Sequence, residues 1–569
     1  MKKTKKVIAL ILAIVLTFSL SSAMTEALAA STEPTTAADD IIDDAADAGE
    51  IVITPQSSGL SKLAFGKMLT SFVSKLANAL LDMIIKVIPG PKLQKFEDYT
   101  YEPIFTGTEV FADEATADSW KVGYASDSLL PDDLTEGEYY IAGYFGGLNG
   151  KKCTGTYDDQ RLAAVALDAG EGIVVFISID GFGMTGVNVN RIRSAIAEYA
   201  QASSIELAGV NVSCTHAHSC VDIHGLGANV SKLLKFALTN FKGESYDPLN
   251  EKFFDNLITT AKNCTAQAIS DLKDGSLYFG TADAADIIRD KQTPIAFDGN
   301  INNIKFVPDD AHENEIWLVN LGVHPTCISS KETNQSADYP GEIVRFAREQ
   351  YGADVAFFQG ASAGIAREGK NLEVNLAEDA TSYERCKAYG QGVATRIAAI
   401  DNYIELDPIL NISYKDIYIP VTNNILVFAV KIQFINNKAV VKDGVVHAVS
   451  EVGYCEIGKE LAIALFPCEI SAEVVFGGTK SAAEAWNGVD WTLPILNTIV
   501  GERHLIAFGL TNDQAGYVVP DNDYANPLAS IFPDLLGEKN KHYEELLSLS
   551  GTAASTIIGA TIELIESAG

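Results

Sequence analysis

The feature that most constrains the fold is an alternation of two patterns that begins at about Lys121. Short β-branched and apolar runs, such as IVVFISID at 173–180, alternate with stretches of helical periodicity, such as VNRIRSAIAEYA at 189–200. This alternation predicts an α/β or mixed α+β domain in which helices flank layered, mixed β-sheets. No internal period typical of solenoids or propellers is present in the sequence, which disfavours repeat architectures.

The N-terminal part of the chain differs in composition from the rest. Residues 1–30 combine early lysines, an apolar run and small residues, which is typical of a cleaved signal peptide and predicts a secreted protein. Residues 31–57 are rich in Ala, Thr, Asp and Glu and indicate a solvated acidic linker. Residues 58–90 show helical spacing of apolar side chains and predict an amphipathic helix. This helix would either pack on the folded domain that follows it or contact a lipid surface through residues 58–88.

Charge and cysteine content narrow the partners and the chemistry. The formal net charge of -33 disfavours nucleic acid as a partner, because phosphate binding needs a basic surface. The eight cysteines do not select a disulfide pairing by their spacing, and buried free thiols are an equally good interpretation. Because the sequence contains no CxxC, a zinc cluster of thiolates is not expected.

Several apolar strands are followed by residues that can bind a metal. The run ELAGVNVSC precedes His216 and His218, whose spacing would place both imidazoles on one side of an extended chain. EIWLVNLGV leads to His324, LAIALF leads to Glu469, and LIAFGL leads through TNDQAG to Tyr517. Two imidazoles and a carboxylate are a frequent set for catalytic zinc, which activates water and polarises carbonyl groups. The strand ends therefore predict a hydrolytic metal site, although spacing alone does not select Tyr517.

Ordered motifs from about Lys121 to Tyr543 resemble the neutral, non-lysosomal ceramidase family. CTHAHS is similar to the family's T-H-T-H-S segment, and LGVHPTC followed by SADYPG is similar to its second histidine strand. PCEIS resembles P-G-E-F-T, and GYVVPDNDY resembles Y-I-T-T-x-E-E-Y. The resemblance implies that residues 100–569 form the family's N-terminal catalytic domain, a zinc-dependent amidase. Its implied substrate is a ceramide-like N-acyl lipid, cleaved to a fatty acid and a sphingoid base.

The same resemblance implies roles for individual residues. The implied ligands of Zn²⁺ are His216, His324, Glu469 and Tyr517. The groups implied to bind substrate or move protons are His218, Arg289 and Tyr543. Asp338 is implied to support the metal ligands by hydrogen bonding from behind.

One departure from the family leaves two alternatives open. The family's proposed catalytic serine lies in a G-D-V-S-P segment, and a gapless alignment with FFQGASAGIAREG places Arg367 there. Ser362 lies in a G-x-S-x-G pattern after the apolar run ADVAFF, so a serine hydrolase with His447 or His504 as its base is one alternative. The other alternative is a non-catalytic lipid-binding homologue that has kept the fold and lost the reaction.

Overall fold

The computed structural model describes residues 93–144, 150–225, 227, 250–431, 436–525, 527 and 542–568. The signal peptide, linker and amphipathic helix predicted for residues 1–90 lie outside this set and stay predictions. Among the helices that are described, none combines the length and the apolarity that crossing a bilayer requires.

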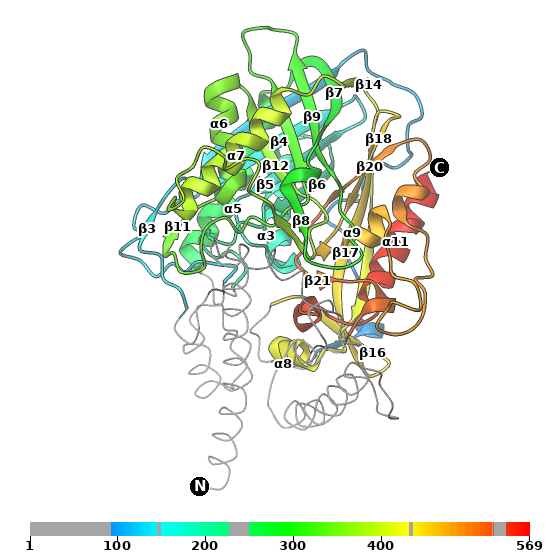
Figure 1. The fold of residues 1–569 in the computed structure, drawn as a ribbon. Coiled ribbons are helices and arrows are strands. Elements are labelled where there is room, and N and C mark those ends of the chain that lie inside the picture. The colour runs from blue at the N-terminus through cyan, green and yellow to red at the C-terminus, as the bar shows by residue number, and fades with distance from the viewer. Residues whose placement is uncertain are drawn as a thin grey trace.

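Two mixed β-sheets form the centre of the molecule (Figure 1). The strands of the larger sheet are, from edge to edge, β12 (Asp354–Gln359), β10 (Ile316–Leu321), β9 (Asn300–Pro308), β7 (Lys273–Asp283), β2 (Trp120–Ser128), β4 (Arg161–Asp168), β5 (Ile173–Ile179) and β6 (Leu207–Cys214), with β14 (Ile404–Leu406) beside β7. The strands of the smaller sheet are β1 (Gln94–Lys95), β16 (Ala439–Lys442), β17 (Val445–Ile457), β18 (Leu461–Leu465) and β20 (His504–Phe508), with β15 (Leu410–Pro420) beside β17. The prediction of a mixed α/β fold is confirmed, and the apolar runs quoted above correspond to β5, β6, β10, β12, β18 and β20.

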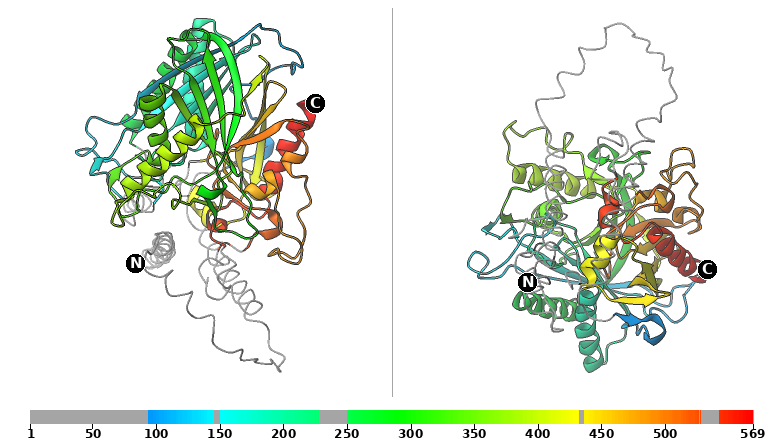
Figure 2. Two further views of the ribbon diagram at one scale, coloured as in Figure 1. Left: turned by 45° about the horizontal axis from the view of Figure 1, so that its top comes forward. Right: turned by 90° about the horizontal axis from the view of Figure 1, so that it is seen from below.

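Helices cover the outer faces of both sheets. On the larger sheet, α3 (Gly186–Ser203) and α5 (Glu251–Ser270) pack over one half, and α6 (Asp338–Tyr351) and α7 (Ser382–Ala398) pack over the other. On the smaller sheet, α11 (Ala553–Ala568) packs against β15 and β17. Figure 2 shows α11 on the side of the molecule opposite to α6 and α7. Two short helices complete the described set: α9 (Ala472–Phe476) shares the core beneath α11, and α8 (Asn424–Lys431) packs in a smaller cluster with Val421 and Ala448.

A hydrophobic core fills the space between the two sheets. The inward faces of β4, β5 and β12 contribute aromatic and aliphatic side chains that meet those of β18 and β20. The rings of Phe358 and Phe508 stack with centroids 4.4 Å apart, and Phe176 packs edge-on against both. Each such buried ring contributes on the order of 2 kcal/mol by leaving water. The order of layers is therefore helix, sheet, sheet, helix.

The larger sheet curls, so that its edge strand β12 lies against β4, β5 and β6. The hydroxyl of Ser178 donates to the carbonyl oxygen of Phe357 at 2.6 Å, which satisfies an acceptor on the edge of β12. The amide of Gly509 donates to the carbonyl oxygen of Gln359 at 2.8 Å and joins this edge to the smaller sheet. These contacts bring the C-terminal ends of β6, β10, β12 and β20 together.

Candidate metal centre

The predicted metal ligands follow the strand ends that meet in this region. His216 comes two residues after β6, and His324 comes three residues after β10. Glu469 and Tyr517 begin β19 (Glu469–Ile470) and β21 (Tyr517–Val518), two short parallel strands in which these residues are register partners. Because paired strands are about 4.8 Å apart, the register places the carboxylate and the phenol side by side.

Donor atoms from all four residues converge. Oε2 of Glu469 lies 3.1 Å from Nε2 of His216 and 3.0 Å from Nε2 of His324. The hydroxyl oxygen of Tyr517 lies 3.4 Å from Nε2 of His324. Ligand atoms about 2.0–2.1 Å from a tetrahedral zinc ion are separated by about 3.3 Å. The spacing of these four side chains therefore fits a zinc ion.

The backbone fixes the tautomers of the two histidines. Nδ1 of His216 lies 2.7 Å from the carbonyl oxygen of Phe182, and Nδ1 of His324 lies 2.9 Å from that of Ile365. A carbonyl oxygen only accepts hydrogen bonds, so Nδ1 carries a proton in each ring, and Nε2 is the nitrogen that can lose its proton and bind a metal. With Nε2 deprotonated, two lone pairs and the carboxylate of Glu469 would face one another, an arrangement that a cation stabilises.

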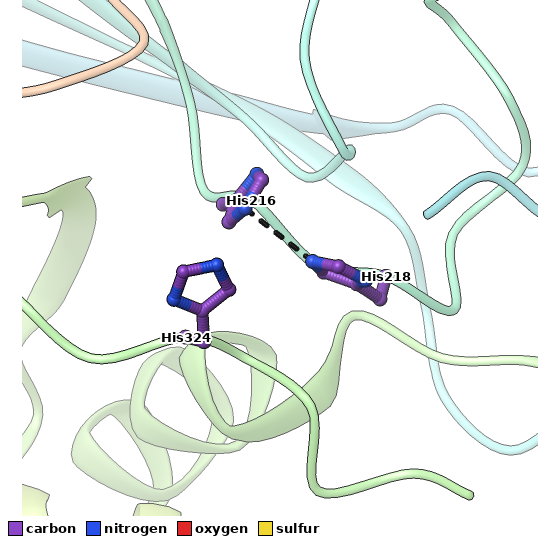
Figure 3. Close-up of side chains that lie close together, drawn as sticks. All are labelled: His216, His218 and His324. Carbon is purple, nitrogen blue, oxygen red and sulfur yellow. Dashed lines mark hydrogen bonds between the residues drawn. The ribbon is translucent and has the colours of Figure 1, made fainter. Parts of the chain in front are cut away.

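His218 lies beside this group, as Figure 3 shows. Its Nε2 is 3.3 Å from Nε2 of His216, and its Nδ1 faces the carbonyl oxygen of Gly143 at 3.0 Å. Nitrogen atoms of all three histidines lie within 4.8 Å of one another, so the geometry also suits His218 as a further ligand. The expectation that an extended chain places both imidazoles on one side is wrong, because β6 ends at Cys214 and His216 has a left-handed φ of 67°. The turn, and not an extended strand, brings the two rings together.

Burial and neighbouring charges set the ionisation of the site. Burial lowers the pKa of His324, and it lowers the pKa of His218 well below its ordinary value, with further lowering from the other histidines. Burial would raise the pKa of Glu469, but the charges and hydrogen bonds of His216 and His324 hold it well below the ordinary value. Burial, followed by the charge of Glu469, raises the pKa of Tyr517 well above 10. A carboxylate and neutral imidazoles are the ionisation states that bind metals.

Gln514 supports the carboxylate and was not identified from the sequence. Its Nε2 donates to Oε1 of Glu469 at 3.1 Å, which leaves Oε2 directed at the histidines. The neighbouring Asp513 accepts hydrogen bonds from the amide of Gly186 and the hydroxyl of Ser450, so the start of α3 and strand β17 both hold this loop. The only sequence signal was the polar TNDQAG segment between a strand and Tyr517.

Of the residues expected to act on the substrate, Tyr543 lies beside a candidate metal ligand, whereas Arg289 is exposed to solvent. The ring of Tyr543 lies 6.0 Å from that of Tyr517, edge to face, on the partly exposed side of the centre. Arg289 is exposed on β8 (Ile288–Asp290), which pairs with β13 (Ile365–Arg367). Nζ of Lys291 lies 5.8 Å from the centre of the Tyr543 ring, and its charge contributes to lowering the pKa of His324. Lys291 is therefore a cation close to the centre that the motifs did not indicate.

Asp338 does not support the histidine rings in the way that the resemblance implied. Its carboxylate accepts hydrogen bonds from the amides of Ile328 and Tyr339, at 3.0 and 2.8 Å. Backbone carbonyl oxygens take its expected place behind His216, His218 and His324. Asp338 instead holds the loop that follows His324.

The G-x-S-x-G segment lacks the geometry of a nucleophile elbow. An elbow connects a strand to a helix, whereas the turn containing Ser362 leads from β12 into strand β13. Ser362 is fully buried. His504 begins β20, about 16 Å along that strand from Gly509, which is the residue that contacts the end of β12. His447 uses Nδ1 to contact the carbonyl oxygen of Val445 on its own strand. The structure therefore does not assemble a serine triad from these candidates.

Arg367, which the gapless alignment places at the position of the ceramidases' proposed catalytic serine, forms an ion pair. Its guanidinium binds the carboxylate of Glu373, which also binds Arg385 at 2.8 Å. A guanidinium in this setting cannot act as a nucleophile.

Two solved structures share this fold. Neutral ceramidase from Pseudomonas aeruginosa matches with a TM-score of 0.57 and 15% sequence identity, over 79% of this chain and 74% of that one. A ceramidase complexed with C2 matches with a TM-score of 0.56 and 15% identity, over 79% and 75% of the two chains. No protein-family profile and no curated protein matches the sequence. The resemblance to neutral ceramidases that the motifs predicted is thus confirmed for the fold.

Proposed function

We propose that this chain is an exported, zinc-dependent amidase that cleaves the N-acyl amide of ceramide-like lipids to a fatty acid and a sphingoid base. The observation that carries the proposal is the convergence of four donor atoms, from His216, His324, Glu469 and Tyr517, with backbone carbonyl oxygens fixing both imidazoles. The fold shared with a neutral ceramidase supports the choice of substrate class. The signal-peptide pattern in residues 1–30 supports export.

The four donors would hold the metal, and the other residues would serve the amide. A bound zinc ion supplies a water of lowered pKa and polarises the amide carbonyl. Gln514 keeps Glu469 aligned by donating to Oε1. Tyr543 and Lys291 line the partly exposed side, where a hydroxyl and an ammonium group can hydrogen-bond substrate oxygens.

His218 is placed to move the proton that amide hydrolysis requires. Hydrolysis transfers a proton from the attacking water to the departing amine nitrogen. Nε2 of His218 carries the lone pair that accepts this proton, because Nδ1 faces the carbonyl oxygen of Gly143. The same carbonyl stabilises the ring while it is cationic, and Nε2 then returns the proton to the amine.

Replacing His218 with alanine tests this role against the role of a metal ligand. We expect kcat to fall about 100- to 1,000-fold, while zinc affinity stays within tenfold of the parent protein. The measurements are steady-state hydrolysis and competitive zinc titration. A loss of zinc affinity as large as that caused by replacing His324 would show instead that His218 is a ligand.

A hydrolysis screen tests the proposed function. The zinc-loaded full-length chain is offered short- and long-chain ceramides in detergent micelles, other N-acyl amides, and matched esters. We expect cleavage of the ceramide amide, loss of activity on treatment with a chelator, and recovery when zinc is returned.

Other outcomes point to the alternatives. Hydrolysis that resists chelation, combined with labelling of Ser362 by an active-serine probe, would replace the proposal with a serine hydrolase. Ceramide binding by a chain that neither binds zinc nor cleaves any amide would identify a non-catalytic lipid-binding protein.

A further inference from the structure

A second cluster of metal-binding side chains lies behind the candidate centre. Cys327, Asp338 and Cys386 are 4%, 0% and 1% exposed, and their ligand atoms all lie within 4.8 Å of one another. They come from three segments: the loop after β10, the start of α6 and the first turns of α7. All eight cysteines are among the described residues, and these two share a candidate metal-binding group.

The donor set and its spacing match a zinc-type ion. Thiolates favour zinc over magnesium or calcium, and structural zinc sites are usually rich in cysteine. With bond lengths of about 2.3 Å to sulfur and 2.0 Å to oxygen, a tetrahedral zinc ion separates a sulfur from an oxygen ligand by about 3.5 Å. Sγ of Cys386 lies 3.8 Å from Oδ1 of Asp338. Small side-chain rotations would bring these atoms to ligand distance.

The surrounding charge also suits a bound divalent cation. Two thiolates and a carboxylate around such a cation leave one negative charge in excess. The guanidinium of Arg367 interacts electrostatically with both Cys327 and Asp338. This guanidinium would balance the excess charge, as buried charges require.

We propose that Cys327, Asp338 and Cys386 form a second, structural site for a divalent ion of the zinc type. The site would link three segments that are far apart in the sequence. Cys327 lies three residues after His324, and Asp338 accepts a hydrogen bond from the amide of Ile328. A metal at this position therefore holds the loop that carries His324 against α6 and α7. Because the sequence contains no CxxC, a zinc cluster of thiolates was not expected, and these two cysteines, distant in the chain, meet only in the fold.

Cobalt substitution distinguishes this site from the histidine centre. The histidine centre offers only nitrogen and oxygen donors, so a thiolate-to-cobalt charge-transfer band in the near ultraviolet reports the cysteine site alone. We expect the full-length chain to bind about two Co²⁺ ions and to show this band. Glu469→Gln should lose one ion and keep the band, whereas Cys386→Ser should lose the band and keep the other ion. This separation tests the cysteine site even if the proposed amidase activity is absent.

Several results would overturn the proposal. A cobalt-loaded parent protein without the charge-transfer band excludes thiolate ligation directly, without any variant. Alkylation after denaturation that leaves Cys327 and Cys386 unmodified, with a mass two hydrogens lower, would show that they form a disulfide. If Cys386→Ser does not fold, Cys327→Ala serves the same purpose, and retention of the band in that protein also contradicts the proposal.

Discussion

Replacing Glu469 with glutamine is expected to lower zinc affinity at least about 100-fold and amide hydrolysis at least about 1,000-fold. Oε2 of Glu469 lies within 3.1 Å of Nε2 of both His216 and His324, so the carboxylate contributes the negative charge at the point where the donors meet. Glutamine has nearly the same volume but no charge, and the fold should therefore remain intact. Zinc content, competitive zinc titration and ceramide hydrolysis measure the effect.

A second buried glutamate provides the control for this substitution. Glu456 lies on β17, where it accepts hydrogen bonds from Tyr454 and Arg503 away from the histidines. Glu456→Gln should reduce stability without changing the zinc affinity of the histidine centre. Unchanged zinc affinity and activity in Glu469→Gln would remove Glu469 from the ligand set, and with it the proposed centre.

Replacing Arg193 with methionine is expected to lower the free energy of unfolding by about 3–5 kcal/mol. Arg193 on α3 pairs with Glu451 on β17 at 2.9 Å, and both side chains are almost fully buried. Tyr101 and Asn512 donate hydrogen bonds to the same carboxylate, at 2.7 and 3.2 Å. Methionine would leave the carboxylate of Glu451 buried without its cation. Urea denaturation measures the resulting loss of unfolding free energy.

Two further variants test whether the uncompensated charge causes this loss. Arg191→Met, on the same helix, removes ion pairs with the exposed carboxylates of Glu251 and Asp255 and should lower the free energy of unfolding by less than about 1 kcal/mol. The double variant Arg193→Met/Glu451→Met should recover part of the lost stability, because no unpaired charge remains. A cost for Arg193→Met as small as that for Arg191→Met would show that the pair contributes little.

The strands and the ends at which ligands appear could be predicted from the sequence, because they depend on local patterns. Runs such as those of β6, β10 and β18 are apolar and short, and a polar residue that can bind a metal follows each one. The pairing of Glu469 with Tyr517 could not be predicted from these patterns. It depends on the parallel register of β19 and β21, two-residue strands that carry no periodic signal.

Other features of the site escaped prediction because their causes are not local. The partners of the histidines are backbone carbonyl oxygens, as in the contact between His216 and Phe182, and any residue type can supply such an atom. The position of Lys291 near Tyr543, and the exposure of Arg289, depend on how β8 and β13 pair. The assembly of Cys327 with Cys386 depends on the packing of α7 against the loop after β10.

The carbonyl contacts behind the three imidazoles also affect how this site can change during evolution. In many metalloproteins a side chain orients each histidine ligand, and a single substitution of that side chain lowers the affinity for the metal. Here the orienting atoms belong to the main chain at Phe182, Gly143 and Ile365, which persists whatever side chain these positions carry. Side chains around the centre can therefore change in evolution while the orientation of the three histidine rings is inherited unchanged.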